Sequence, residues 1–234
     1  MNGWIEITTC INCNGNLQPY RAVTTAPYLM VDFCGGALPV STTSTFSKCT
    51  ACGLVAQSPR MTDDRIAQYY SSGLYRQTLG IPVEAMDADE LRRAQDVMEW
   101  LYKHGIKNPA SHADIGASRG FLLQEIGART QRGFDTNPKY GDYKLIENDR
   151  YDLVTAIHVL EHTTSPIEEI KWYKSLSADK VLIEVPGENC KGGPLRFAHL
   201  YYFPPNVLAN MMQDAGLKIL EIETEPNTRI LAEV

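Results

Sequence analysis

This sequence has no long apolar run, no excess of basic residues and only one cysteine after residue 60. No uninterrupted apolar segment approaches the ~18 residues that a membrane-spanning helix needs. The N-terminus, MNGWIEITTC, has neither the basic region nor the long apolar stretch of a secretory signal. We therefore expect a cytoplasmic protein that does not associate with membranes. Its 22 Lys and Arg stand against 28 Asp and Glu, and the net charge of -6 makes nucleic acid an unfavourable partner.

Composition divides the chain near residue 60. The first 60 residues carry three basic and two acidic side chains, whereas the remaining 174 carry 19 and 26. Five of the six cysteines lie in the first part: Cys10, Cys13, Cys34, Cys49 and Cys52. The chain is therefore expected to consist of a small cysteine-rich module followed by a larger acidic one.

Hydrophobic periodicity predicts a different architecture for each part. Residues 1–60 favour short strands and turns. Residues 61–108 are expected to form a helical connector, with one helix over 63–70 capped by Thr62 or Asp63 and a longer one that begins at Asp87 or Asp89 and ends at Gly105. In residues 109–234, strands are predicted near 112–116, 131–135, 152–158, 180–185, 217–224 and 228–234, and helices from 120, over 166–177 and over 204–215. This alternation is typical of an α/β fold with a mainly parallel sheet, and the short link before the last strand makes that strand antiparallel.

Two C-x-x-C pairs, Cys10 with Cys13 and Cys49 with Cys52, are each followed by a turn-forming glycine. Two such turns can direct four sulfurs at one ion, so we predict a structural Zn²⁺ site in a zinc-ribbon-like β module. Redox-active dithiols and disulfides are the weaker interpretations, since a cytoplasmic protein seldom keeps disulfides. Cys34 and Cys190 are expected to be ordinary buried or loop cysteines.

The segment from Asp114 to Gly120, DIGASRG, is the most informative in the chain. An apolar strand ends in a turn of small residues, with Gly116 and Ser118, that opens a helix, which is the geometry in which backbone approaches a ligand closely. Fifteen residues beyond Gly120, Asp135 ends the next predicted strand with a carboxylate suited to the two hydroxyls of a ribose. Together these features predict an adenosine-bearing cofactor.

A competing hypothesis starts from the same glycines. Gly116, Ser118 and Gly120 also fit the G-x-S-x-G turn of serine hydrolases, with Ser118 as nucleophile and His199 downstream. That turn normally follows several strands and an oxyanion loop, whereas cysteine-rich and helical sequence precedes it here. The hydrolase therefore remains a minor alternative.

With the segment YDLVTAIHVLEH at 151–162, this pattern resembles class I S-adenosylmethionine-dependent methyltransferases, in which the sheet is Rossmann-like. Ser118 stands where the family has its middle glycine. The resemblance implies that the turn lines the methionine part of the cofactor, that Asp135 holds the ribose, and that the end of the strand near 152–158 lies beside the sulfonium. The implied cofactor-binding residues are Asp114, Gly116, Ser118, Gly120, Asp135, Ile157 and His158.

The sequence also resembles the zinc-containing branch of this family, which includes nucleotide-sugar C-methyltransferases. The resemblance rests on the paired cysteine turns, a tyrosine-rich connector, the V-L-E-H strand end, IEVPG at 183–187 and HLYYF at 199–203. The resemblance implies that His199 is a base. Ala198 replaces the acid that precedes this histidine in the sugar enzymes, which weakens the case for carbon methylation. His162 is the second catalytic candidate, and Tyr75 and Tyr202 are expected to orient the acceptor.

These observations predict methyl transfer to a small molecule, with a sugar or nucleotide-sugar as the leading acceptor class, methylated at carbon or oxygen with a histidine base. The alternatives are an RNA methyltransferase and a non-catalytic zinc-dependent interaction protein. The segment 136–151 is short, and Tyr140, Glu147 or Asn148 is expected to meet the adenine. Glu161 is expected either to anchor its loop or to touch ligand, and His104 and His112 to lie at the surface or at helix ends. The oligomeric state stays open.

Overall fold

A six-stranded sheet forms the centre of the computed structural model, which describes residues 3–24, 28–31, 37–40, 43–72, 82–137, 139–140 and 149–234. Its strand order is β13-β14-β11-β10-β8-β9. The strands are β8 (Ser111–Ile115), β9 (Thr130–Phe134), β10 (Tyr151–Ile157), β11 (Ser177–Val185), β13 (Lys218–Glu223) and β14 (Thr228–Glu233). The first four are parallel neighbours, and β14 pairs antiparallel with both β11 and β13. The predicted mainly parallel sheet with an antiparallel last strand is confirmed.

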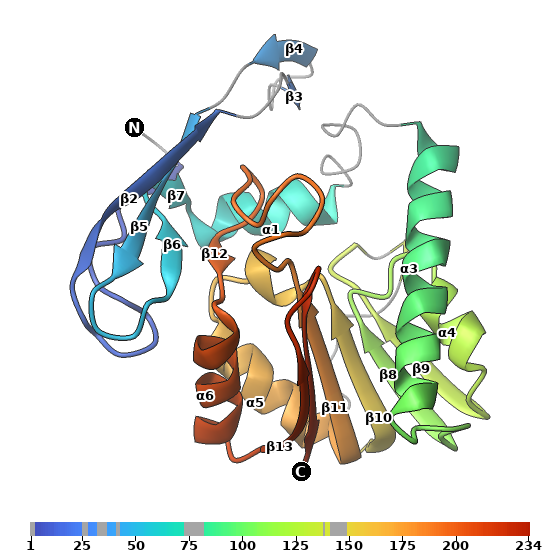
Figure 1. Ribbon diagram of the computed structural model, residues 1–234. Coiled ribbons are helices and arrows are strands. Elements are labelled where there is room, and N and C mark those ends of the chain that lie inside the picture. The colour runs from blue at the N-terminus through green and yellow to red at the C-terminus, as the bar shows by residue number, and fades with distance from the viewer. Residues whose placement is uncertain are drawn as a thin grey trace.

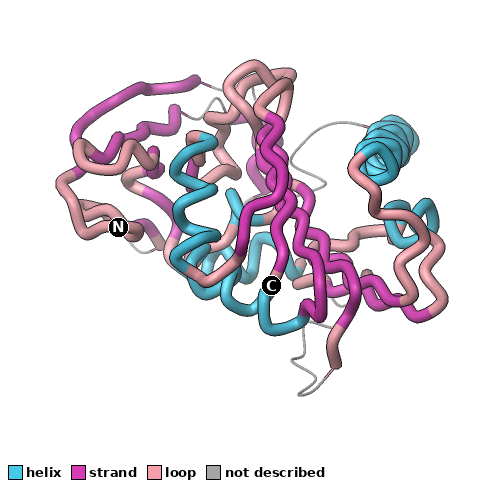
Figure 2. The backbone as a smooth tube through the Cα atoms, turned by 60° about the horizontal axis from the view of Figure 1, so that its bottom comes forward, coloured by secondary structure: helices cyan, strands magenta, loops and turns pink. Residues whose placement is uncertain are grey.

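Helices cover both faces of this sheet (Figures 1 and 2). Neighbouring residues of a strand point to opposite faces. Thus Leu153 packs in a cluster with residues of α3 (Val83–Lys103) and α4 (Phe121–Ile126). Val154 packs in another cluster with residues of α5 (Pro166–Leu176) and α6 (Pro205–Asp214). Because both faces are buried, the central strands read as continuous apolar runs.

The cysteine-rich part folds as short antiparallel strands. These are β1 (Trp4–Ile5), β2 (Leu17–Thr24), β3 (Tyr28–Val31), β4 (Ala37–Val40), β5 (Thr43–Cys49), β6 (Val55–Gln57) and β7 (Arg60–Met61). Strands β2, β5 and β6 belong to a four-stranded sheet of order β12-β6-β5-β2, whereas β1 pairs with β7 and β3 with β4. The first strand of that order, β12 (Tyr201–Tyr202), comes from late in the chain and pairs with β6 (Figure 1). The N-terminal sheet is therefore completed by the other part of the protein.

The backbone of Leu200 makes this junction explicit. Its N–H donates to the Glu161 carbonyl at 2.8 Å, and its own carbonyl accepts from the Gln57 N–H at 2.8 Å. The Gln57 side chain also donates to the Phe197 carbonyl at 3.1 Å. Glu161 belongs to the short 3₁₀ helix η1 (Leu160–His162), so the N-terminal sheet, the segment before β12 and η1 form one hydrogen-bonded unit.

The connector contains two helices in its described residues. Helix α1 (Asp63–Ser71) follows Thr62, as predicted. Helix α3 begins at Val83, so the prediction of a start at Asp87 or Asp89 is wrong. Pro82 precedes the first turn with φ -54°, a value that suits helix initiation. The aspartates form ion pairs instead, Asp87 with Arg119 and Asp89 with Arg92.

Helix α3 ends as predicted, with His104 at its C-cap and Gly105 in the left-handed conformation at φ 83°. Within the described ranges, no helix combines the length and apolar character needed to cross a membrane.

Candidate active site

A cavity of about 1250 Å³ opens at the carboxyl ends of the parallel strands. Gly116, Asp135, His158 and Pro186 each follow directly on the end of one of these strands, β8, β9, β10 and β11 respectively, and all four line the cavity. Loops at this edge of an open α/β sheet are where such folds bind ligands. Helix α3 and the segment before β12 complete the wall.

The glycine turn between β8 and α4 has the tight geometry expected from its sequence. Gly116 has φ 71°, and a Cβ placed on it would lie 2.3 Å from Cγ2 of Val159. Its N–H donates to the Phe134 carbonyl at 2.7 Å, which ties the turn to β9. Ser118 adopts φ 49°, and Gly120, with φ 75°, precedes α4 and does not line the cavity. Only a residue without a side chain fits at Gly116.

Asp135 lies directly beside this turn. One carboxylate oxygen accepts from the Ser118 N–H at 3.0 Å and the other from the Asn137 N–H at 2.8 Å. A carboxylate has about four lone-pair sites, so it retains the capacity to accept two further hydrogen bonds from a diol. The Ser118 hydroxyl donates to Glu90 on α3 at 2.9 Å, a carboxylate rather than the imidazole that a hydrolase nucleophile needs.

Asp114 is 5% exposed and lines the cavity. Thr155 donates to its carboxyl group at 2.6 Å, and Nε2 of His112 lies 2.8 Å from the same threonine hydroxyl. Burial raises the pKa of Asp114 to about 7 and lowers the pKa of His112 to about 3. The expectation that His112 lies at the surface is wrong, because it is fully buried on β8 and its neutral ring bonds to the neighbouring strand.

His158 lies at the end of β10 with φ 54°. Its Nε2 is 2.9 Å from Oε1 of Glu184, which also accepts from the Asn227 amide at 2.9 Å. The other oxygen of Glu184 pairs with Arg229, which reaches Asp96 on α3 as well. Burial opposes ionisation of Glu184, but His158 and Arg229 outweigh it and lower its pKa to about 2. The role of Glu184 is not predicted by the sequence motifs, although an acid inside the apolar run of β11 is a visible signal.

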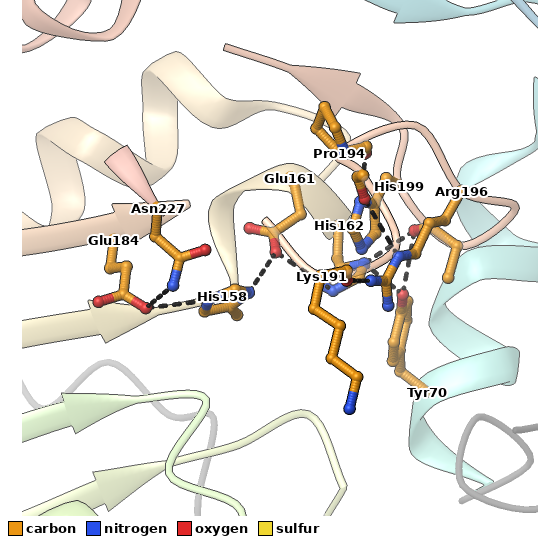
Figure 3. A network of polar contacts seen from close by, with 12 residues as sticks. Tyr70, His158, Glu161, His162, Glu184, Lys191, Pro194, Arg196, His199 and Asn227 are labelled. Atoms are coloured by element: carbon orange, nitrogen blue, oxygen red, sulfur yellow. Dashed lines mark hydrogen bonds and ion pairs between the residues drawn. The ribbon is translucent and has the colours of Figure 1, made fainter. Parts of the chain in front are cut away.

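His162 and His199 are brought together, with ring centroids 4.9 Å apart (Figure 3). Nδ1 of His162 lies 2.8 Å from the Ala198 carbonyl and 2.8 Å from the Tyr70 hydroxyl. Nδ1 of His199 lies 2.6 Å from the Pro194 carbonyl. A carbonyl only accepts, so both rings carry their proton on Nδ1. Burial lowers the pKa of His162 to about 4 and that of His199 well below its ordinary value, which keeps both rings neutral at pH 7.

Glu161 lies between His158 and His162. Its Oε1 is 3.6 Å from Nδ1 of His158 and 3.7 Å from Nε2 of His162, and the side chain is 1% exposed (Figure 3). Neither of its oxygens has a hydrogen-bond partner among the residues that the structure describes. Burial raises the pKa of Glu161 to about 8.

The remaining predicted site residues fall into three groups. Ile157, at the end of β10, lines the cavity. Tyr140 also lines the cavity. Tyr202 is not part of the cavity wall, since it packs against the apolar cluster of Phe46, Val55 and Leu195. Tyr75 and residues 141–148, which include the adenine candidates Glu147 and Asn148, lie outside the described residues.

The four cysteines of the paired turns converge. Sγ of Cys10 lies 3.5 Å from Sγ of Cys52, Sγ of Cys13 lies 3.5 Å from Sγ of Cys49, and all four sulfurs are within 4.8 Å of one another. Tetrahedral Zn–S bonds of about 2.3 Å place sulfurs roughly 3.8 Å apart. A Cβ on Gly15 would lie 3.1 Å from Sγ of Cys49, so this position has little room for a side chain. The donor set and its dimensions fit a closed zinc site.

Solved structures of other proteins share this fold, whereas the sequence is distant from theirs. No curated protein matches the sequence significantly. Among solved structures, magnesium protoporphyrin IX methyltransferase from Synechocystis PCC 6803, with bound S-adenosylhomocysteine, is 16% identical with a TM-score of 0.54, covering 73% of this chain and 99% of that one. The 1,6-didemethyltoxoflavin-N1-methyltransferase from Burkholderia thailandensis is 16% identical with a TM-score of 0.55, covering 81% and 95%. These similarities confirm the fold.

The family itself is shown by a sequence model described as a methyltransferase domain, which matches residues 74–222, well over half of the chain. The match includes the glycine turn, Asp135 and the three histidines of the cavity. The chain therefore belongs to the methyltransferase domain family, which confirms the expected enzyme class, a methyltransferase.

Proposed function

We propose that this protein transfers the methyl group of S-adenosylmethionine to a negatively charged small molecule, with a nucleotide-sugar as the leading acceptor class. The observation that carries the proposal is a single cavity with two differently equipped ends. One end has the glycine turn and Asp135, and the other has Glu161 and the two neutral histidines. A donor and an acceptor can therefore meet in one cavity, which is what an in-line displacement needs.

The donor would occupy the end formed by β8, β9 and β10. Asp135 would accept hydrogen bonds from the ribose, and the turn at Gly116 would face the methionine part. Ile157 and His158, at the end of β10, would lie beside the sulfonium. This arrangement is supported by the free lone pairs of the Asp135 carboxylate and by the close approach that the bare backbone of Gly116 allows.

Two cationic side chains support an anionic acceptor, although the cavity wall carries eight carboxyl groups against four cations. Arg93 on α3 and Lys191 in the segment before β12 both line the cavity, and Arg93 also acts electrostatically on Glu161. Figure 3 shows the Lys191 side chain extending away from the histidines. These cations belong to a cavity rather than to an extended basic stripe, and the chain has a net charge of -6, so a small phosphate-bearing molecule suits them better than RNA.

A histidine base would remove the proton of the acceptor. Because Nδ1 of His199 donates to Pro194, its Nε2 carries the lone pair that can take a proton from a hydroxyl. In the reaction, the acceptor oxygen bonds to the methyl carbon, the C–S bond electrons return to sulfur, and the hydroxyl proton moves to the imidazole. The pKa of His199 is lowered by burial, which keeps the ring in its proton-accepting form.

We also propose that Cys10, Cys13, Cys49 and Cys52 hold a structural Zn²⁺. The hydrogen bonds of Cys52 and Ala51 to Sγ of Cys49 outweigh burial and lower the pKa of that thiol to about 6, whereas burial raises the pKa of Cys10 to about 12, so the ion would have to displace the proton of Cys10. The ion would supply no step of the reaction. Its role would be to fix the sheet that β12 completes, next to His199.

The test is a turnover screen with S-adenosylmethionine and nucleotide-sugars, sugars and RNA as acceptors. We expect methylated product only from a phosphate-bearing small molecule, and a loss of about 10²- to 10⁴-fold in kcat for His199→Ala. His104→Ala is the matched control, because His104 caps α3 and does not line the cavity. Methylation of RNA alone would refute the acceptor class, and unchanged turnover of His199→Ala would refute the base.

A further inference from the structure

We propose that Glu161, His162 and His199 form a binding site for a divalent transition-metal cation in the wall of the methyl-transfer cavity. The role of this cation in catalysis depends on the proposed function, but its binding does not. One carboxylate and two imidazoles offer ligand atoms that all lie within 4.8 Å of one another. This is the ligand number and chemistry of open metal sites, which bind through three protein side chains and keep positions for water or substrate.

The orientation of the two rings supports the proposal. Metal-bound histidines usually donate their other N–H to a backbone carbonyl or carboxylate, which fixes the ring and its tautomer. Here Nδ1 of His162 faces the Ala198 carbonyl at 2.8 Å and Nδ1 of His199 faces the Pro194 carbonyl at 2.6 Å. Nε2 is therefore the unprotonated nitrogen in both rings, and Nε2 of His162 is the atom that lies 3.7 Å from Oε1 of Glu161.

The environment of Glu161 supports the cation site independently of the orientation of the two rings. Its side chain is 1% exposed and lines the cavity, yet neither carboxylate oxygen has a hydrogen-bond partner in the described ranges. A buried polar group without a partner costs about 1–3 kcal/mol, more if it is charged, so native structures rarely keep one without a reason. A cation bound by this carboxylate would satisfy both oxygens at once.

The cation would also bear on the choice of acceptor. Bound here, it would leave coordination positions facing the cavity, where a hydroxyl or carboxylate oxygen of the acceptor could become a ligand. A coordinated hydroxyl loses its proton more readily, because the cation stabilises the oxyanion. The proton would then pass to solvent, and the cation would take over the task that a free His199 otherwise performs.

Co²⁺ distinguishes this site from the cysteine cluster. Protein loaded with zinc is titrated with Co²⁺ and followed by equilibrium dialysis and visible absorption. We expect about one Co²⁺ per chain in addition to zinc, with weak d–d bands and without the intense thiolate-to-cobalt bands that binding to cysteine gives. Glu161→Gln and His199→Ala should each weaken binding by at least about 10-fold, the lower range for disturbing a metal site. His104→Ala should leave it unchanged.

Binding of S-adenosylmethionine by the Glu161→Gln variant, measured by calorimetry, shows whether that variant is folded and whether the donor end is intact. Retained donor binding with lost Co²⁺ binding supports the cation site. If Co²⁺ binds only with thiolate bands, or if all variants bind it equally, the cation proposal is wrong. Full turnover after exhaustive chelation of added cations, still dependent on His199, would overturn the role of the cation in catalysis, while leaving the histidine base and the proposed function in place.

Discussion

The buried ion pair beneath His158 gives a quantitative prediction. Glu184 is fully buried on β11 and its carboxylate meets Arg229, which is 5% exposed, and His158. Glu184→Gln keeps the size of the side chain and removes the charge. Arg229 would then lose the buried negative charge beside its Nε, although Asp96 still faces its other end. We expect this variant to be markedly less stable than the unchanged protein.

The loss of stability in Glu184→Gln can be estimated in two ways. Lowering the pKa of Glu184 from 4.5 to about 2 corresponds to about 3 kcal/mol of preference for the ionised form in the folded state. Removing one member of a buried ion pair typically costs about 3–5 kcal/mol, because the other charge stays buried. The two agree at the lower end, and about 3 kcal/mol in a chain of this size lowers Tm by roughly 6–12 °C.

The stability that Glu184→Gln loses should become smaller as the pH falls. The pKa of Glu184 is depressed in the folded state, so its contribution is complete above the unfolded pKa of 4.5 and is lost as the pH falls toward about 2. The difference in unfolding free energy between the unchanged protein and Glu184→Gln should therefore be largest at pH 7 and narrow steadily below pH 4.5. Urea unfolding at a series of pH values measures this difference.

Glu233→Gln is the matched control. Glu233 also lies on the sheet and pairs with Lys180 and Lys218, but its side chain is 38% exposed. Exposed pairs are worth about 1 kcal/mol or less, so this variant should change stability little. If the two variants lose the same stability at pH 7, or if the deficit of Glu184→Gln does not shrink at low pH, the charge of Glu184 is not what stabilises this region.

Three further variants test the cavity and the cysteines. Gly116→Ala should lower the thermal stability of the protein by more than Gly105→Ala. Both glycines have positive φ, but only at Gly116 would an added Cβ lie 2.3 Å from a methyl group. Equal losses of stability would refute the steric argument. Asp135→Ala should weaken S-adenosylmethionine binding by at least about 100-fold in calorimetry, because two hydrogen bonds to a charged group are worth at least about 3 kcal/mol. Unchanged affinity would remove Asp135 from the donor site. Cys10→Ser should lose zinc in metal analysis, whereas Cys190→Ser should keep about one ion per chain, and zinc-free folded protein would contradict the structural site.

The parts of the fold that were predicted correctly have local patterns. The strand, turn and helix around Gly116 occupy consecutive residues, and Asp135 follows its strand directly, so their positions at the sheet edge follow from periodicity alone. The short link before β14 likewise fixed its antiparallel direction. The pairing of two C-x-x-C turns was also predictable, because ligand spacing within each turn is a local property.

The parts that were missed depend on contacts between distant residues. His112 reads as a polar residue at a strand start, and its buried role depends on Thr155, which is 43 positions away. Strand β12 has two residues and therefore no periodicity, and only its partner β6 defines it. The start of α3 was misplaced because acidic residues suggested a cap, whereas Asp87 forms an ion pair with Arg119 in the turn before α4.

The hydrogen bonds of Leu200 have a practical consequence for protein engineering. Composition suggests cutting the chain near residue 60 to obtain a smaller catalytic fragment. Such a cut would remove the Gln57 N–H from the Leu200 carbonyl and leave the edge of β12 exposed, one residue from His199. Unpaired strand edges favour aggregation. We therefore expect the fragment to aggregate and to lose the position of His199 in the cavity, and a graft of the cysteine module onto another methyltransferase would need to bring residues 197–202 with it.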